Sequence, residues 1–305
     1  MRCVSWFAVV IVQALLLVAT HALTPRRKTQ LRKFIGAQDA IQDALSAGKT
    51  FQIPQQLVFT SKYSSLEDTP AAMQKNVKHT MSLNPELEVR WFADSDCHDY
   101  LAKHFDEELV RIFDSEEQGN YRGDLCRAAV LAKEGGFYSD LDVEWKFPMR
   151  ELVDGDTTFM SAISPVNGGE MLNALIAASP GNELLGATLA EVKKWYRNAT
   201  VHQGWMGPMT LLRGVQANCP DVALDRQVLD ISCGSHKLKI YEQRHMRCTP
   251  DDLACPPVRA QGFDGVQYGI FHPESVNDVV AYPRYAECTS WGCNGGGWNH
   301  SKANI

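Results

Sequence analysis

The first half of the chain alternates between short apolar runs and segments in which apolar positions recur at helical spacing. Residues 53–60 and 89–92 are apolar runs that predict two strands. Residues 71–81 predict a helix, and residues 97–105 predict a second helix whose start is capped by the polar side chains at 94–96. This alternation predicts an α/β fold with a mostly parallel central sheet that helices cover on both faces.

The next stretch predicts a helix, a glycine turn and a short strand. Alanine-rich residues up to Glu134 form the helix, and the pair Gly135-Gly136 follows where a left-handed residue ends many helices. Residues 137–143 then form the strand. The turn brings the end of the helix and the strand close together.

Four charged residues lie on either side of that turn. Asp124 and Arg127 are three residues apart and share a helix face, while Asp140 and Asp142 are two apart and share a strand face. Two carboxylates so close together require either a shared proton or a cation. Mn²⁺ or Mg²⁺ is the natural cation, because these ions take oxygen ligands and bridge to a diphosphate. The pattern therefore predicts a nucleotide-sugar site in which Arg127 reaches the diphosphate or a sugar hydroxyl and Asp124 accepts from sugar hydroxyls.

The composition narrows the class of protein. Of the 305 residues, 45% are hydrophobic and 22% are charged, which is typical of a globular domain with a core. The 30 basic and 36 acidic side chains give a net charge of -6, which is unfavourable for binding a nucleic-acid backbone. We therefore expect no nucleic-acid partner.

The N-terminus has the order of a secretory leader: Arg2, an apolar run, and a small-residue exit at Ala22. Two interpretations stay open, a signal peptide cleaved after Ala22 and an uncleaved single-pass anchor. The expected organisation is 1–22 for the leader, 23–50 for a basic stem helix, 51–285 for the globular domain and 286–305 for a Cys/Gly-rich tail.

The cysteines agree with a secretory route. Nine are present, and those other than Cys3 form an even set of which most lie after residue 218. Disulfides are therefore expected in the C-terminal part, with Cys248/Cys255 and Cys288/Cys293 as local candidates. A zinc site is the alternative.

The motif from Asp124 to Asp142 resembles the DXD sugar-binding region of glycosyltransferase family 32, which includes yeast-type α-1,6-mannosyltransferases and inositol-phosphoceramide mannosyltransferases. The shared elements are Asp-Leu-x-Arg, a glycine pair and Tyr-x-Asp-x-Asp. The surrounding Ile53-Pro54, Asn84-Pro85 and Trp91-x-x-Asp94 are also similar to that family. Beyond about residue 165, only Asn173, Pro180-Gly181 and Gly207-Pro208 echo it.

The resemblance implies a GT-A fold and a role for each matching residue. Asp142 would coordinate the metal, and Asp140 would contact the donor ribose or the metal through water. The donor sugar would be bound by Asp124, Arg127 and Tyr138. The base would be contacted by the backbone of Val58, Phe59 and Thr60. Trp91 would either line the base pocket or belong to the core. His272, Trp298 or His300 would complete the site near the C-terminus, with His300 as a further metal ligand.

The same resemblance implies the reaction. A metal-dependent enzyme would move a hexose from GDP-mannose or a UDP-hexose to a glycan or sphingolipid acceptor with retention of configuration. Since no carboxylate nucleophile is evident, a front-face route is the hypothesis. The expected location is the Golgi lumen or membrane, or outside the cell after signal cleavage.

Two other functions remain open. A catalytically inactive lumenal protein that binds sugar nucleotides or serves as a scaffold would keep the fold. Alternatively, residues 140–144 spell the Asp-x-Asp-x-Glu end of the family 18 chitinase motif, in which the last Glu is the general acid of a hydrolase.

Overall fold

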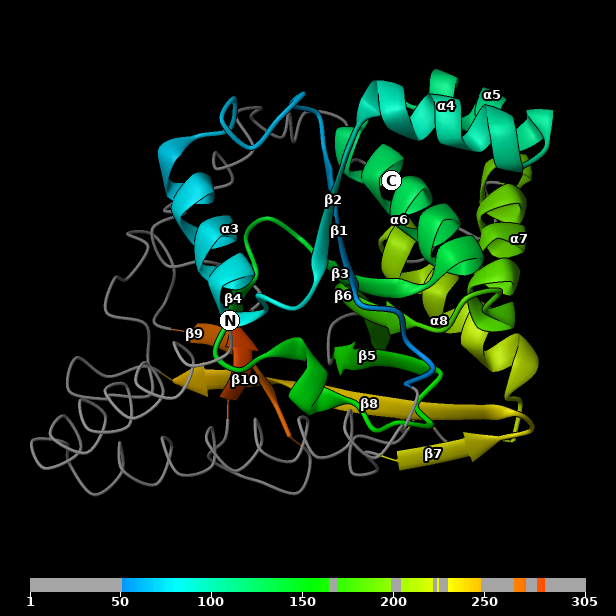
Figure 1. The fold of residues 1–305 in the computed structure, drawn as a ribbon. Coiled ribbons are helices and arrows are strands. Elements are labelled where there is room, and N and C mark those ends of the chain that lie inside the picture. The colour runs from blue at the N-terminus through cyan, green and yellow to red at the C-terminus, as the bar shows by residue number, and fades with distance from the viewer. Residues whose placement is uncertain are drawn as a thin grey trace, which may run out of the picture. The chain divides into compact units, whose positions relative to one another are not determined.

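The computed structural model describes residues 51–164, 169–198, 204–221, 224, 230–247, 266–272 and 279–282. All of them belong to one compact unit that begins at Phe51. Its helices are α3 (Ala71–Leu83), α4 (Asp94–His104), α5 (Glu107–Ser115), α6 (Gly119–Glu134), the short 3-10 helix η1 (Met149–Leu152), α7 (Glu183–Arg197) and α8 (Met206–Asn218) (Figure 1). Its strands are β1 (Gln56–Ser61), β2 (Glu88–Ala93), β3 (Gly136–Ser139), β4 (Glu144–Trp145), β5 (Phe159–Ser164), β6 (Glu170–Ala178), β7 (Asp230–Cys233), β8 (His236–Arg247), β9 (Val266–Phe271) and β10 (Val279–Tyr282).

The strands join one sheet in the order β2-β1-β3-β6-β5-β8-β9-β10-β4, with β7 paired to β8. Strands β2, β1 and β3 run parallel, as do β5 and β8, and the other neighbours run antiparallel. The expected α/β class, with parallel strands joined through helices, is confirmed. A family 18 hydrolase needs a closed barrel of eight parallel strands, so this mixed sheet does not support that alternative.

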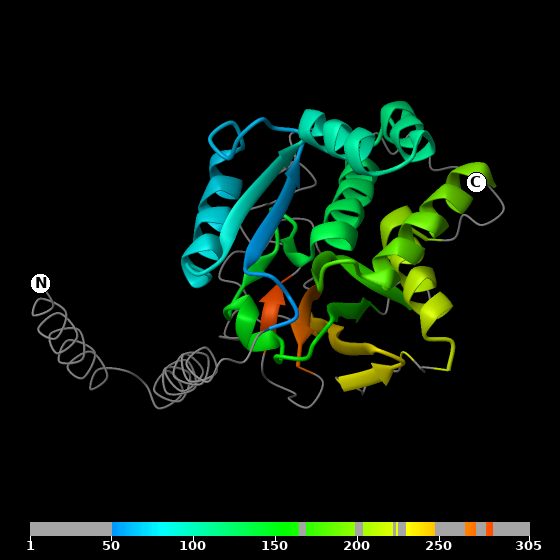
Figure 2. The ribbon, with the colours of Figure 1, turned by 45° about the vertical axis from the view of Figure 1, so that its right-hand side comes forward.

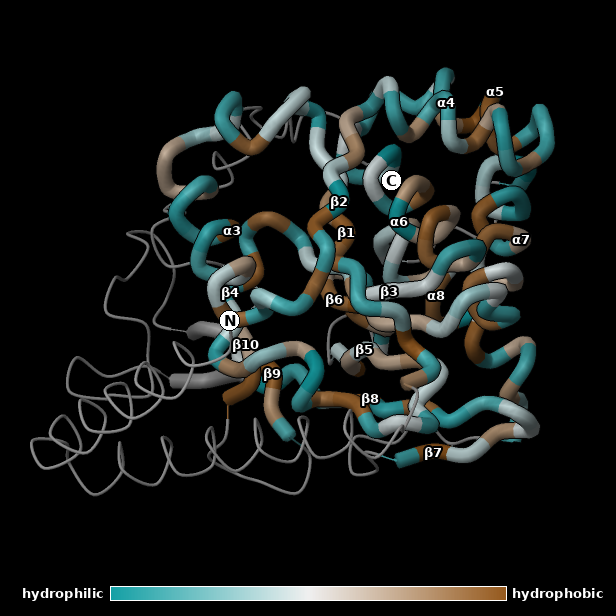
Figure 3. Tube along the Cα trace, in the orientation of Figure 1, coloured by the Kyte–Doolittle hydropathy of each residue, from teal (hydrophilic) through white to brown (hydrophobic). Residues whose placement is uncertain are grey.

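Helices cover both faces of the sheet, with α3 on one side of β1 and β2 and α6 on the other (Figures 1 and 2). The core has two parts accordingly. Val58 belongs to the cluster that apolar residues of α4 to α8 form, whereas its neighbour Phe59 belongs to the cluster that includes Met73 and Val77 of α3. Successive strand residues point to opposite faces, so β1 serves both parts and is hydrophobic along its middle (Figure 3).

The predicted strands at 53–60 and 89–92 correspond to β1 and β2, and the predicted helix at 71–81 corresponds to α3. The expected capping is confirmed in part: α4 begins at Asp94 rather than Cys97, so residues 94–96 form its first turn, and Asp96 is the one whose side chain caps the helix. Asp96 lies inside the first turn, where its carboxylate accepts the Ala93 N–H at 2.9 Å. A side chain at the third helical position can reach back to the N-cap in this way.

The strand predicted at 137–143 is shorter in the structure. Strand β3 ends at Ser139, and Leu141 and Asp142 form a turn in which the Val143 N–H donates to the Asp140 carbonyl at 3.2 Å. Asp140 and Asp142 therefore do not share a strand face. They lie on a turn that follows the end of β3. The backbone of this turn is hydrogen-bonded to Ala174 of β6 and to Asn76 of α3.

Two disulfides join described cysteines, Cys97 to Cys126 and Cys219 to Cys233. The second confirms the expected disulfide in the C-terminal part. The candidates Cys248/Cys255 and Cys288/Cys293 lie outside the described residues. Neither observed pairing was predicted. The first ties α4 to α6, and its Cys126 lies between Asp124 and Arg127 in the sequence of α6.

Removing the α4–α6 disulfide is expected to lower the free energy of unfolding by about 3 to 4 kcal/mol, the loop-entropy value for a separation of 29 residues. The double variant Cys97→Ala/Cys126→Ala would be compared with the wild type by urea unfolding. The ion pair between Arg122 and Asp94, at 2.8 Å, also joins α4 to α6 and remains in the variant. A loss below about 1 kcal/mol would show that the disulfide adds little to this link.

No helix among the described residues is both long and apolar enough to cross a membrane. The leader at 1–22 and the stem at 23–50 lie outside the described residues. The choice between a cleaved signal and an anchor therefore stays a prediction.

Candidate functional site

The glycine turn between α6 and β3 places the site. Gly135 and Gly136 have φ of +71° and +105°, values that side-chain-bearing residues rarely adopt. A Cβ at Gly135 would lie 2.6 Å from the Ala178 carbonyl oxygen, so the backbones also pass too closely for a side chain. This turn sets the end of α6 against β3, and Asp124 and Arg127 meet Asp140 as the sequence predicts.

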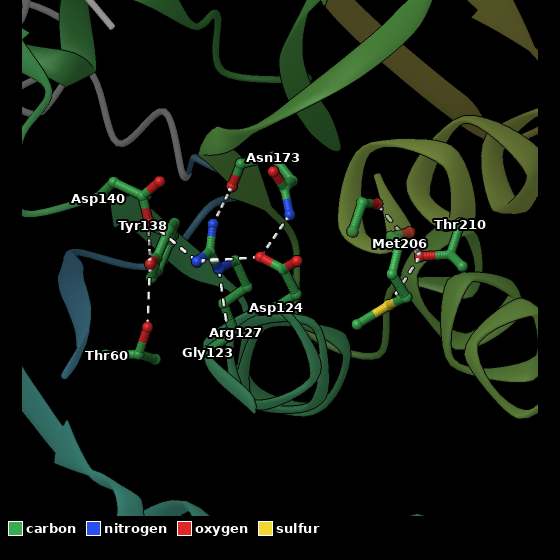
Figure 4. A network of polar contacts seen from close by, with 10 residues as sticks. Thr60, Gly123, Asp124, Arg127, Tyr138, Asp140, Asn173, Met206 and Thr210 are labelled. Carbon is green, nitrogen blue, oxygen red and sulfur yellow. Dashed lines mark hydrogen bonds and ion pairs between the residues drawn. The ribbon is translucent and has the colours of Figure 1, made fainter. Parts of the chain in front are cut away.

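Arg127 is the centre of the polar network shown in Figure 4. Its Nη2 lies 3.2 Å from Asp124 Oδ1 and 3.0 Å from Asp140 Oδ1, and its Nη1 donates to the Asn173 carbonyl at 2.8 Å. Its guanidinium carbon lies 4.4 Å from the centre of the Tyr138 ring. Only 5% of the residue is exposed. Burial alone would lower its pKa, but Asp140, Tyr138 and Asp124 together raise it, so Arg127 is a fixed cation.

Asp124 is held by donors from two other elements, β6 and α8, and by Arg127 of its own helix. Its Oδ1 accepts the Asn173 Nδ2–H of β6 at 2.8 Å, and its carboxylate accepts the backbone N–H of Gly207 at the start of α8. Burial is the largest influence on Asp124 and raises its pKa to about 6, although Arg127 opposes the shift. A buried carboxylate with fixed donors is suited to accept from a sugar hydroxyl with a defined direction.

Tyr138 connects the first strand to Asp140. The Tyr138 hydroxyl donates to Asp140 Oδ1 at 2.6 Å and lies 3.0 Å from Thr60 Oγ1 of β1. Burial raises the pKa of Tyr138 well above its ordinary value, so the phenol stays a donor. Since Oδ1 of Asp140 accepts from both Tyr138 and Arg127, the carboxylate is fixed while 29% of the side chain remains exposed.

The two aspartates of the motif fit a divalent cation in part. The contacts of Asp140 with Tyr138 and Arg127 named above use its Oδ1, and not its Oδ2. Asp142 is half-buried on the turn and lies close enough to Arg127 to contribute to its raised pKa. Within the described ranges, no group of three or more His, Cys, Asp and Glu side chains is placed to hold a metal. Two carboxylates suit a hard cation whose other ligands are diphosphate oxygens and water.

The other residues implied by the resemblance have varied surroundings. Val58 and Phe59 are fully buried in the core, whereas the Thr60 side chain joins the network. Trp91 packs on Phe59, with ring centres 6.0 Å apart, and its indole N–H donates to the Tyr63 carbonyl at 2.9 Å. His272 packs edge-on against Tyr241, and Trp298 and His300 lie outside the described residues.

Asn173 and Gly207 complete the network. The family resemblance named both residues, but the predicted site did not include them. Asn173 is the single amide in the apolar run 171–178, and this break in the pattern was the available signal. Gly207 is the second residue of α8, beside Pro208, but nothing local in the sequence connects it to Asp124. A Cβ at Gly207 would lie 2.3 Å from Asp124 Oδ2 and 2.1 Å from Asn173 Nδ2.

Replacing Gly207 by alanine is therefore expected to displace Asp124 and lower activity toward a nucleotide sugar by about a hundredfold, the cost of an ångström-scale misplacement. Gly186→Ala is the matched control, because Gly186 lies within α7 and a Cβ there meets nothing within 4 Å. It should keep full activity and raise stability by about 0.5 to 1 kcal/mol. Equal activity in the two variants would contradict the role of Gly207.

The raised pKa of Asp124 predicts a pH dependence. Protonation below about 6 removes its negative charge, so kcat/KM for the donor should fall on the acid side with a midpoint near 6. Folding stability depends on pH in the opposite direction. Because the pKa of Asp124 is higher in the folded protein than its ordinary value of 3.8, the contribution of Asp124 to the free energy of unfolding is full below pH 3.8 and is lost as the pH rises through about 6. Rates measured from pH 5 to 8 test the first statement, and an acid limb that persists unchanged in Asp124→Asn would contradict it.

Comparison with known proteins agrees with the chemistry of the site. Residues 70–159, under a third of the chain, match the family model described as glycosyltransferase sugar-binding region containing DXD motif. The match includes every residue from Asp124 to Asp142, supports a sugar-transferase function, and does not single out family 32. No curated protein matches the sequence.

Some solved structures have a partly similar fold. The PaToxG glycosyltransferase has 16% sequence identity and a TM-score of 0.46, covering 62% of this chain and 81% of its own. The galactosyltransferase LgtC, solved in complex with donor and acceptor sugar analogues, has 14% identity and a TM-score of 0.32, covering 52% of this chain and 70% of its own. At these scores the likenesses say nothing about the substrate of this chain.

Proposed function

We propose that this protein is a metal-dependent retaining glycosyltransferase of family 32 type with a GT-A fold. It moves a hexose from GDP-mannose or a UDP-hexose to a glycan or sphingolipid acceptor. The leader and the cysteine pattern favour a place in the secretory pathway, in the Golgi or outside the cell. One observation carries the proposal: a buried arginine joins a buried aspartate on α6 to the first aspartate of the DXD turn.

The geometry suits the recognition of a sugar joined to a diphosphate. Arg127 is held by two carboxylates and a carbonyl, so its charge is fixed in position before a ligand arrives. Asp124 offers an oriented acceptor for sugar hydroxyls, and Asp140, 29% exposed, would contact the ribose of the donor or the metal through water. Asp140 and Asp142 would hold Mn²⁺ or Mg²⁺, which when bound supplies positive charge to the departing diphosphate.

The reaction exchanges one bond at the anomeric carbon for another. The bond to the diphosphate oxygen breaks, and the acceptor oxygen bonds to the same face of the sugar. In the front-face route the proton of the acceptor hydroxyl passes to the departing phosphate oxygen, so no protein nucleophile is needed. Arg127 would stabilise the charge that develops in this step.

Nucleotide binding tests the proposal independently of turnover. Titration of UDP and GDP into the protein by calorimetry, with Mn²⁺ and with EDTA, should show that one nucleotide binds and that EDTA weakens its binding. If folded protein binds neither UDP nor GDP, with or without Mn²⁺, a scaffold role would be favoured instead.

A further inference from the structure

A buried asparagine on α3 contacts the backbone of the DXD turn. Asn76 is 1% exposed and lies between Met73 and Val77, which belong to the core. Its Nδ2 donates to the carbonyls of Leu141 and Val143, each at 2.9 Å. These carbonyls belong to the residues directly before and after Asp142, so one side chain bonds the backbone on both sides of that aspartate.

The chemistry of the amide fixes its orientation. An NH₂ group has two hydrogens, one for each carbonyl, whereas a reversed amide would set Oδ1 against two carbonyl oxygens. Oδ1 of Asn76 is buried and has no hydrogen-bond partner in the described part of the chain. A buried acceptor without a donor costs stability. Holding the turn therefore explains Asn76 better than the packing of α3 does.

The rest of the turn is fixed by other contacts. The Asp140 N–H donates to the Ala174 carbonyl of β6 at 2.7 Å, and the side chains of Leu141 and Val143 are buried in the core shared with α3. One helical turn after Asn76, the His79 ring lies 3.0 Å from the Trp145 carbonyl. Thus the sheet fixes the first aspartate, and α3 fixes the backbone around the second.

We propose that Asn76 is a positioning residue for Asp142. By holding the carbonyls on both sides, it sets the direction in which the Asp142 carboxylate meets the divalent cation and the diphosphate of the donor. The inference rests on the proposed function and adds to it a residue far from the motif in sequence. Contacts that orient a ligand to a metal typically change metal affinity by about ten- to a hundredfold.

The test compares two buried asparagines that are eight positions apart along the chain. Asn84 is also 1% exposed, donates to the Thr80 carbonyl at 2.8 Å and accepts the Met149 N–H at 2.7 Å. Asn76→Ala and Asn84→Ala therefore remove the same group from similar surroundings, and urea unfolding should show a loss of stability in both. Calorimetric titration of Mn²⁺ with UDP or GDP should show affinity about tenfold weaker in Asn76→Ala only.

Three outcomes overturn the assignment. Equal weakening in both variants would show a structural effect, and unchanged affinity in Asn76→Ala would show no effect on the site. If Asn76→Ala does not fold, Asn76→Ser is compared with Asn84→Ala instead. An affinity of Asn76→Ser equal to that of the wild type would also overturn the assignment. Failure of the proposed function is distinct from these, because the wild type would then bind neither nucleotide.

Discussion

Replacing Arg127 by lysine is expected to lower kcat/KM for the nucleotide sugar by about a thousandfold, the upper range for loss of a fixed charge donor. The guanidinium bonds Asp124, Asp140 and the Asn173 carbonyl at once and stacks on Tyr138. A lysine ammonium is a single point charge on a flexible chain and cannot reproduce these directions. The two carboxylates would keep a cation between them but lose their relative positions.

Arg150 offers a matched control for this substitution. It is also buried, at 3% exposure, where it donates to the Ile53 carbonyl at 2.9 Å and lies 3.7 Å from the centre of the Phe51 ring, away from the polar network. Arg150→Lys should lower stability and leave kcat/KM close to that of the wild type. If both variants lose activity equally, Arg127 would have only a structural role.

Replacing Asp142 by asparagine should have an effect of similar size, about a thousandfold in kcat/KM. Asparagine keeps the shape of the turn and the backbone bonds to Asn76, but it removes the charge that a divalent cation requires. The variant should therefore keep the stability of the wild type while losing turnover. Asp99→Asn on the exposed face of α4 serves as the control. Rates that remain within about tenfold of wild type would rule out Asp142 as a metal ligand.

The parts of the site that depend on local sequence were predictable. The spacing of Asp124 and Arg127 on one helix face, and the glycine pair that ends the helix, follow from helix geometry and from backbone sterics. The structure confirms that these elements bring Arg127 to Asp140. The length of the strand was not predictable in the same way, because the turn at Asp140 is fixed by hydrogen bonds to β6 and α3.

Contacts across long sequence separations account for the rest. Asn173 is 49 residues from Asp124, and Gly207 lies still further along the chain. Asn76 is 65 residues from the Leu141 carbonyl that it holds. The resemblance named Asn173 and Gly207 without a role, and it did not name Asn76. The role of each residue appears only when the sheet order and the packing of α3 and α8 are known. The missed residues thus position the site, whereas the predicted ones carry its charge.

A donor screen tests most directly whether this protein is a metal-dependent glycosyltransferase. Protein starting near Thr24 would be incubated with GDP-mannose and a set of UDP-hexoses in Mn²⁺ or in EDTA, and the release of GDP or UDP would be recorded. A metal-dependent glycosyltransferase should turn over one donor, only in the presence of the metal, and this turnover should be abolished in Asp142→Asn. Turnover of no donor by well-folded protein, or equal turnover in EDTA, would contradict this proposed function.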